Sequence, residues 1–177
     1  GPQFLSSTKG AYGWNQAIRP EIDVYKYFIA DKSRAEELKN IGFGVALSFN
    51  KDGIVRGTAA LVSLASLNEN ELIIKDRAAA GFSFNKGSSS QDYPSSLMGS
   101  IALLRQTYYD AQWYDRQSSQ SSTSEYNISL DAFNNLISLP IIFDVADKQS
   151  ALRANRIGKE FSSKYIIKGN GDEYQRI

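Results

Sequence analysis

Short apolar runs alternate with a helix-period segment along the last part of the chain. Residues 140–146 form one apolar run, residues 147–161 repeat apolar positions at helical spacing, and residues 164–169 form a second run. This order predicts a strand, a helix and a strand, and residues 172–177 begin another helical pattern. Such a unit is typical of parallel sheets and barrels, whose strands need neighbours on both sides. We therefore expect the sequence to be a piece of a larger domain.

The region upstream predicts a helix followed by an antiparallel hairpin. Asp31 has the chemistry of a helix cap, and Gly42 that of a helix stop. Apolar runs separated by turn residues then predict three strands, at residues 43–49, 57–65 and 71–75. The short turn between the last two runs makes them antiparallel neighbours.

Three other segments of the first half have weaker patterns. Residues 1–20 are rich in Gly, Ser and aromatic side chains, which predicts an irregular stretch packed by its rings. Residues 22–29 fit either a strand or a short helix, because periodicity does not separate the two. Residues 78–84 fit one more short strand.

The second half of the chain predicts two helices joined by a polar loop. Apolar side chains recur at helical spacing through residues 97–114. Residues 115–126 are of polar low complexity, and we expect them to form a mobile surface loop. Ser129 is expected to cap the next helix, which Pro140 ends.

The composition is that of an ordinary globular chain and excludes several kinds of chemistry. The 177 residues are 42% hydrophobic and 22% charged, with a net charge of +1. A charge so close to zero gives no electrostatic footprint for nucleic acid. The sequence has no cysteine, which excludes disulfides and thiolate catalysis, and no histidine, the commonest general base and metal ligand. No apolar run reaches the roughly 18 residues that a membrane helix needs.

Two loops carry groups that could bind an anion. Arg56 lies beside a glycine in residues 50–57 and could hold an anion, or it could be the surface arginine of a hairpin turn. Residues 85–92 precede the helix predicted at residues 97–114, whose first backbone amides could also bind an anion. The alternative for that segment is a flexible loop that ends in a helix cap.

The ends of the last two predicted strands hold a third candidate site. The carboxyl ends of the strands carry the chemistry in parallel barrels. Here these ends carry Asp144 and Lys168, followed by Asp147 and Gly169. Asp144 and Lys168 could be an acid–base pair, or they could be an ion pair at the rim of a barrel.

Several motifs of the chain resemble those of one enzyme superfamily. The closing unit has a proline-led strand, an acidic turn, a helix that ends in Gly158-Lys-Glu-Phe161, and the segment Gly169-Asn-Gly-Asp-Glu-Tyr174. These features resemble the amidohydrolase superfamily, and within it the imidazolonepropionase-like enzymes. Three more motifs, Gly13-Trp-Asn-Gln-Ala-Ile-Arg-Pro-Glu-Ile-Asp23, Ser95-Ser-Leu-Met-Gly-Ser-Ile-Ala-Leu-Leu-Arg-Gln-Thr-Tyr108 and Tyr165-Ile-Ile-Lys-Gly169, resemble large exported amidohydrolase-like proteins of Bacteroidetes. The resemblance implies a distorted (β/α)8 barrel, metal-dependent hydrolysis of amide-like bonds, and a periplasmic or cell-envelope location.

The chain departs from the superfamily at the metal ligands. Catalytic members have a metal-binding histidine in the first of the two closing strands and another at the end of the second. These positions here hold Asp144 or Ala146, and Gly169. The His-x-His motif of the first barrel strand is also not in this sequence. The resemblance therefore implies the first, ligand-degenerate half of such a protein, whose second half would hold a divalent, zinc-like metal that activates water.

We therefore predict a partial (β/α)8 barrel segment with an irregular N-terminal stretch and a β-hairpin insertion. Residues 1–177 would form one incomplete domain that continues beyond both ends. The segment would hold no cofactor and no metal of its own, and it would support the structure or shape the pocket of a metal-dependent C–N bond hydrolase. Its partner would be the remainder of its own polypeptide, including a second amidohydrolase-like half, without nucleic acid and without a membrane span.

The alternative function is a non-catalytic scaffold or interaction module of a cell-envelope assembly. Aromatic side chains would serve that role if they were exposed, at residues 12–14 and at Tyr108, Tyr109, Trp113 and Tyr114. The same rings could instead be core side chains.

Overall fold

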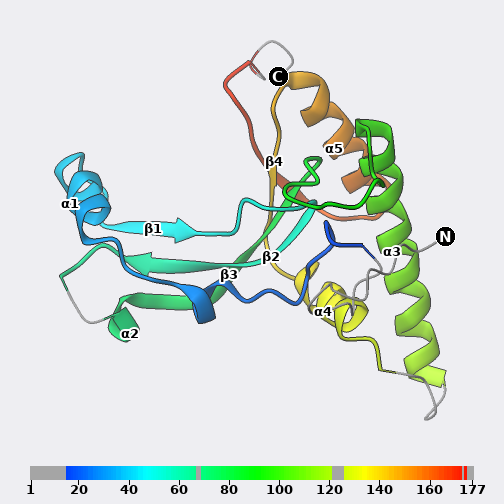
Figure 1. The fold of residues 1–177 in the computed structure, drawn as a ribbon, viewed down its shortest axis with the longest axis horizontal. Helices are drawn as coiled ribbons and strands as arrows, with labels where there is room; N and C mark the ends of the chain where they lie inside the picture. Colours follow the sequence, from blue (N-terminus) through cyan, green and yellow to red (C-terminus); the bar gives the residue numbers. More distant parts are fainter. Residues whose placement is uncertain (1–14, 67–68, 121–125, 173, 175–177) are drawn as a thin grey trace.

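The computed structural model describes residues 15–66, 69–120, 126–172 and 174 (Figure 1). Five strands form one sheet in the order β1-β2-β3-β4-β5. The bounds of the strands are Val45–Ser48, Val55–Ser63, Ile73–Ser83, Ile141–Asp144 and Tyr165–Lys168. The first two pairings are antiparallel and the last two are parallel. We call β1, β2 and the part of β3 that pairs with β2 the hairpin arm, and the end of β3 together with β4 and β5 the parallel wall.

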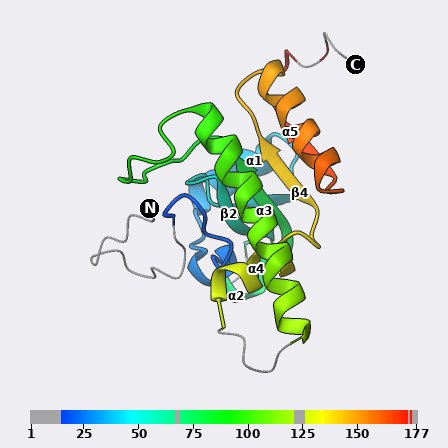
Figure 2. The ribbon, with the colours of Figure 1, turned by 90° about the vertical axis from the view of Figure 1, so that its right-hand side faces the viewer.

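The helices divide between these two parts of the sheet. The 3-10 helix η1 (Val24–Tyr27), α1 (Lys32–Asn40) and α2 (Glu69–Leu72) accompany the arm, whereas α3 (Leu97–Gln120), α4 (Ile128–Leu136) and α5 (Lys148–Glu160) accompany the parallel wall. Figures 1 and 2 show that α3, α4 and α5 gather on one side, while β1 and β2 extend away from them. No described helix is both long and apolar enough to cross a membrane.

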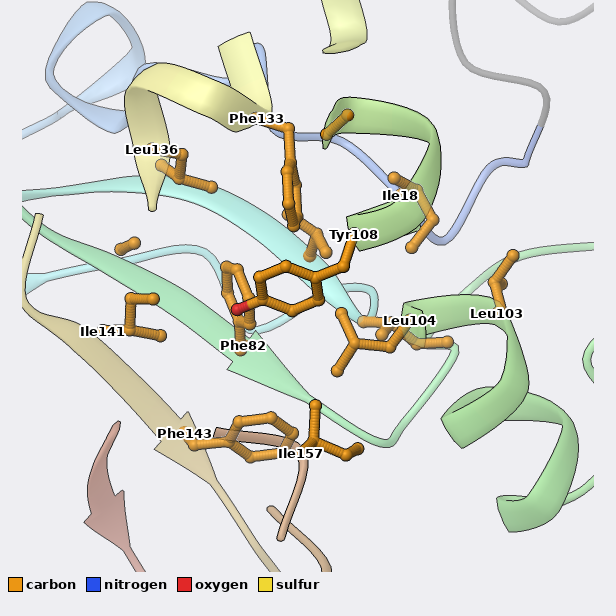
Figure 3. Packing of buried hydrophobic residues seen from close by; sticks show 14 of the residues in the cluster. Ile18, Phe82, Leu103, Leu104, Tyr108, Phe133, Leu136, Ile141, Phe143 and Ile157 are labelled. Carbon is orange, nitrogen blue, oxygen red and sulfur yellow. The ribbon is translucent and has the colours of Figure 1, made fainter. Parts of the chain in front are cut away.

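The hydrophobic core lies between the helical layer and the parallel wall (Figure 3). Phe82 of β3 and Phe143 of β4 are partners in register, and both are fully buried. Tyr108 of α3 meets Phe133 of α4 edge-on at 5.0 Å between ring centroids and stacks on Phe161 at 4.3 Å. Large aromatic side chains dominate such cores because each buries a large apolar area. The core thus fixes the three helices on the parallel wall.

The opposite face of the parallel wall is less covered. Successive side chains of a strand point to opposite faces, and in β4 Ile141 and Phe143 are buried while Ile142 is half-buried. In β5 the side chain of Ile166 is 57% exposed. Apolar side chains are therefore partly exposed on the face of the parallel wall that lies away from the helices.

The predicted strands are largely confirmed, with one correction. The segments at residues 43–49 and 57–65 form β1 and β2, and the closing strands and the helix between them are present. The strands predicted at residues 71–75 and 78–84 are wrong as separate elements, because α2 ends at Leu72 and one continuous strand, β3, follows. The charged residues at 75–77 interrupt the apolar pattern, but Leu61 and Ala59 of β2 still pair with Lys75 and Ala79. Backbone pairing thus continues through a polar stretch.

The helix boundaries differ from the prediction at two places. Helix α3 continues to Gln120, so residues 115–120 are helical where a loop was expected, while residues 121–125 lie outside the described residues. The polar side chains at 115–120 include Arg and Gln, which are good helix formers, and no Pro or Gly interrupts them. The cap of α4 is Asn127 rather than Ser129, because the Asn127 side chain accepts hydrogen bonds from the amides of Ser129 and Leu130.

The remaining predictions for the termini are resolved only in part. Residues 22–29 contain the 3-10 helix η1, which decides between the two predicted alternatives. Residues 15–20 are irregular as expected, whereas residues 1–14 lie outside the described residues. Most of the helical pattern at residues 172–177 also lies outside them.

Candidate functional site

The carboxyl ends of three parallel strands meet at one edge of the sheet. Ser83, Asp144 and Lys168 are the last residues of β3, β4 and β5, and the register pairs Ser83 with Asp144 and Asp144 with Lys168. The Lys168 Nζ atom lies 2.7 Å from Oδ1 of Asp144. The parallel register therefore produces the ion pair that was one of the two predicted alternatives.

A buried arginine from the arm completes this cluster. The Nη1 atom of Arg56 lies 2.9 Å from Oδ2 of Asp144, and its Nε donates to the carbonyl oxygen of Gly53 at 3.0 Å. Arg56 is only 4% exposed, and it lies beside Gly81 of β3, where an added Cβ would be in ordinary van der Waals contact with the Arg56 side chain at 3.4 Å. The cluster of Arg56, Asp144 and Lys168 thus connects β2, β4 and β5.

Asp144 is held as a carboxylate by its two cationic partners. Partial burial raises its pKa, but hydrogen bonds from Lys168 and Arg56, with their charges, outweigh burial and lower the pKa below its ordinary value. Each carboxylate oxygen accepts from a cation, so Asp144 is a weak base and, at neutral pH, no proton donor. This arrangement favours the ion-pair alternative in its geometry, and a catalytic role of Asp144 or Lys168 stays a prediction.

The two loops that were separate anion candidates contact each other. Asp52 accepts hydrogen bonds from the amide of Ser88 at 2.6 Å and from its hydroxyl at 2.7 Å, and Arg19 lies 3.3 Å away. The Ser88 hydrogen bonds are the main reason that the pKa of Asp52 is lowered. Gly87 has a φ of +67°, and a Cβ on it would lie 1.9 Å from Oδ1 of Asp52. The loops are thus joined at a contact that only glycine fits.

The protein itself occupies the groups that could have bound an anion. The Arg56 guanidinium is buried on Asp144 and Gly53, so it is not the exposed arginine of a hairpin turn either. In residues 85–92 the amide of Ser88 donates to Asp52 and that of Ser90 to Oε1 of Gln16 at 3.0 Å. At the start of α3 the Ser96 hydroxyl accepts from the amide of Gly99. These groups therefore make structural contacts in both loops, although Arg56 is buried where the structural alternative predicted a surface arginine.

The donor groups at the strand ends do not fit a metal ion. Asp144 is engaged by two cations, Ala146 and Gly169 have no ligating side chain, and Asp147 caps α5 by accepting from the amide of Ser150 at 2.7 Å. Within the described ranges, no group of three or more Asp, Glu, His or Cys side chains could hold a metal. Histidine and cysteine are absent from the whole sequence. The described residues therefore supply no zinc-type site.

Sequence reasoning missed a second charged cluster, around Asp23. Its carboxylate accepts from Nε and Nη2 of Arg77 at 3.0 and 2.8 Å, from Lys26 at 3.0 Å and from the Thr58 hydroxyl at 3.2 Å. Burial opposes its charge, yet these partners lower the pKa of Asp23 below its ordinary value. The pairing joins the segment before η1 to β2 and β3 across distant positions of the sequence, and no local pattern indicates it.

A cavity of about 630 Å³ lies in the arm rather than at the strand ends. Side chains of α1, β1 and β2 line it, among them Leu38, Ala46 and Val62, and neither Asp144 nor Lys168 contributes to it. The charged cluster and the cavity are therefore separate features of the fold.

The comparisons with known proteins bear on the fold. No family model matches the sequence, and no curated protein matches it. Among solved structures, an amidohydrolase from Thermotoga maritima MSB8 matches with a TM-score of 0.69 over 94% of this chain, at 18% sequence identity. The fold is amidohydrolase-like. An identity this low shows the fold alone, and the chain spans 48% of the length of that amidohydrolase.

The structural match confirms the coarse part of the predicted resemblance. A mixed α/β sheet with parallel strands and helices on one side fits part of a barrel, as predicted. The closer resemblance to imidazolonepropionase-like enzymes and to exported Bacteroidetes proteins stays a prediction.

Proposed function

We propose that this chain is a structural and pocket-shaping segment of a larger amidohydrolase-like protein that hydrolyses C–N bonds with a metal held elsewhere in its polypeptide. The observation that carries the proposal is the match to an amidohydrolase over 94% of this chain but only 48% of the other. A function is grafted onto a fold by its site, and within the described residues no group of three or more Asp, Glu, His or Cys side chains could hold a metal ion. The metal chemistry is therefore assigned to the remainder of the polypeptide.

The uneven covering of the parallel wall supports this proposal. In a closed barrel, helices cover the outside of the strands and side chains fill the inside. The helices α3, α4 and α5 cover one face, while Ile142 and Ile166 leave apolar surface on the other. Further strands of the same polypeptide would bury that surface and pair with the free edge of β5. The partner that we propose is thus the rest of the protein's own barrel, followed by a second amidohydrolase-like half.

The Arg56–Asp144–Lys168 cluster has a structural role in this proposal. It lies where parallel barrels place their chemistry, yet its carboxylate is already neutralised by two cations. Lys168 is half exposed, so its free surface could contact a substrate that enters the whole barrel. We propose that the cluster holds the strand ends in place and forms part of the wall of the pocket.

The test uses the full-length protein. Metal content is measured by plasma mass spectrometry, and hydrolysis is measured on a panel of cyclic and linear amides. The proposal expects the Asp144→Asn and Lys168→Met variants to keep the wild-type metal content and a kcat within about tenfold of wild type. Any larger change is expected in KM. Loss of metal in Asp144→Asn, or a kcat lowered by about a thousandfold or more, would show that this segment belongs to the catalytic centre.

A second candidate function rests on the aromatic side chains of α3. Tyr108 and Tyr114 are buried, but Tyr109 and Trp113 are 51% and 57% exposed. Exposed Tyr and Trp are enriched at protein interfaces, which favours an interaction module in a cell-envelope assembly as the alternative. Full hydrolase activity of the second half expressed alone, with no contribution from this segment, would favour that alternative.

A further inference from the structure

Helix α5 and the turn after it form a segment with a local excess of positive charge. Residues 148–164 contain five basic residues and one acidic residue, whereas the whole chain has a net charge of only +1. The rest of the sequence is therefore net acidic, and this helix with the turn after it has a net charge opposite in sign to that remainder. A local charge excess of this kind creates a positive potential at the surface even when the total charge is near zero.

The basic side chains of α5 share one face of the helix. Residues 150, 154, 157 and 158 are buried and form the inner face. Arg153, Arg156 and Lys159 recur at spacings of three and are exposed, and Leu152 lies among them with 42% of its surface exposed. Positions three and four apart lie on the same side of a helix, so these four side chains form a continuous outer face. Figure 2 shows α5 at the outside of the molecule, beside β4.

These cations are not neutralised by the described part of the protein. The acidic residue of α5, Glu160, is paired with Arg105 of α3 at 2.8 Å. Arg153, Arg156, Lys159 and Lys164 form no ion pair with any residue in the described ranges. Arg153 interacts with Asp147 only at longer range. The face thus presents unpaired positive charge on a rigid helix.

One exposed aromatic side chain of α3 borders this basic face, and a second lies one helical turn beyond it. Tyr109 lies beside the C-terminal end of α5, because its hydroxyl donates to Glu160 at 3.4 Å and its ring meets Phe161 edge-on at 5.1 Å. Trp113 follows one turn later on α3 and is 57% exposed. Arg, Tyr and Trp are the residue types that carry most of the binding energy at protein interfaces. The basic–aromatic face, defined as Leu152, Arg153, Arg156, Lys159, Tyr109 and Trp113, thus combines charge with rigid apolar area.

We propose that the basic–aromatic face is a docking surface for an acidic segment of a partner protein. Charge complementarity identifies the occupant, since unpaired guanidinium and ammonium groups select carboxylates. A membrane is disfavoured because the apolar face of α5 is buried in the core and cannot enter lipid. Nucleic acid is disfavoured because the rest of the chain is net acidic. The proposal goes beyond the hydrolase role and does not depend on it.

The experiment measures binding of labelled acidic polypeptides to the full-length protein by fluorescence anisotropy. The probes are poly-L-glutamate and a random copolymer of glutamate and tyrosine of equal length. The proposal expects the copolymer to bind more tightly, and both probes to bind about tenfold more weakly when the salt is raised from 50 to 200 mM. Charge reversal by Arg153→Glu, Arg156→Glu and Lys159→Glu together is expected to weaken both at least tenfold. Trp113→Ser is expected to weaken the copolymer only.

A matched control separates local charge from total charge. Lys32→Glu, Lys51→Glu and Lys75→Glu change the net charge by the same amount at exposed lysines that form no ion pair within the described residues, and they should alter binding by less than twofold. All the substituted side chains are exposed, so the melting temperatures of the variants should match that of wild type. Equal weakening by the two triple variants, or no weakening by either, overturns the proposal. Tighter binding to vesicles of three parts phosphatidylcholine to one part phosphatidylglycerol, or to duplex RNA, overturns the assignment to an acidic protein.

Discussion

Arg56 reaches Asp144 across 88 positions of the sequence and contacts it at 2.9 Å. This contact ties the start of the hairpin arm to the carboxyl end of the second parallel strand. The guanidinium is almost fully buried, whereas Lys168 on the other side of the same carboxylate is half exposed. The two cations of one cluster should therefore contribute unequally to stability.

Arg56→Ala is expected to lower the free energy of unfolding by about 2–3 kcal/mol, because it leaves a partly buried carboxylate with one partner. Lys168→Ala should cost about 0–1 kcal/mol, as for an exposed ion pair. Denaturant unfolding followed by circular dichroism measures both values. Similar costs for the two variants would show that the buried arginine has no special role.

Gly87→Ala is expected to destabilise the protein through both strain and contact, because φ is +67° and the new Cβ would lie 1.9 Å from Asp52. Gly42→Ala is the matched control, since Gly42 also has a positive φ of +103° but has open space around it. The control should cost about 1 kcal/mol from strain alone, and Gly87→Ala clearly more. Thermal unfolding of the two variants measures the difference. Equal shifts in melting temperature would show that the close contact between position 87 and Asp52 adds no cost beyond backbone strain.

Glu21 and Asp23 should respond to pH with opposite sign. Burial raises the pKa of Glu21, more than hydrogen bonds and Arg19 lower it, so its charged form costs stability above its unfolded pKa. The pKa of Asp23 is lowered, so its contribution is present above its unfolded pKa and is lost as the pH falls through the folded pKa. At pH 7, Glu21→Gln should therefore raise the free energy of unfolding and Asp23→Asn should lower it.

Both pH effects should shrink as the pH falls to about 3, where the carboxyl groups become protonated in the unfolded chain. Urea unfolding between pH 3 and pH 8 measures them. A difference between wild type and Glu21→Gln that does not change with pH would show that packing, and not ionisation, governs this position.

Phe133→Ala is expected to cost about 3–5 kcal/mol, because the ring is fully buried and contacts both Phe82 and Tyr108. Trp113→Ala, on the exposed side of the neighbouring helix, should change the free energy of unfolding by less than about 0.5 kcal/mol. Equilibrium unfolding compares the two. A large cost for Trp113→Ala would mean that its ring is covered in the whole protein.

Local patterns predicted most elements, because apolar periodicity, caps and turn residues act within a few positions. The α1 cap at Asp31 and the strand–helix–strand order from Ile141 to Lys168 follow from such signals. The continuous strand β3 did not, since its charged residues 75–77 are held in place by pairing with β2 and not by their own pattern. Helix boundaries and caps also differed from the prediction, as at Asn127, which caps α4 in place of Ser129.

The sequence by itself determined the order of most elements, the absence of histidine and cysteine, and an ion pair of Asp144 with Lys168 as one of two alternatives. Only the tertiary structure decided that Arg56 joins them, that Asp52 binds the loop containing Gly87, and that Asp23 collects Arg77 and Lys26. The physical reason is the separation in sequence over which each kind of interaction acts. Secondary structure follows from neighbouring residues, whereas a buried charge is satisfied by whichever partner the packed sheet brings within hydrogen-bond distance.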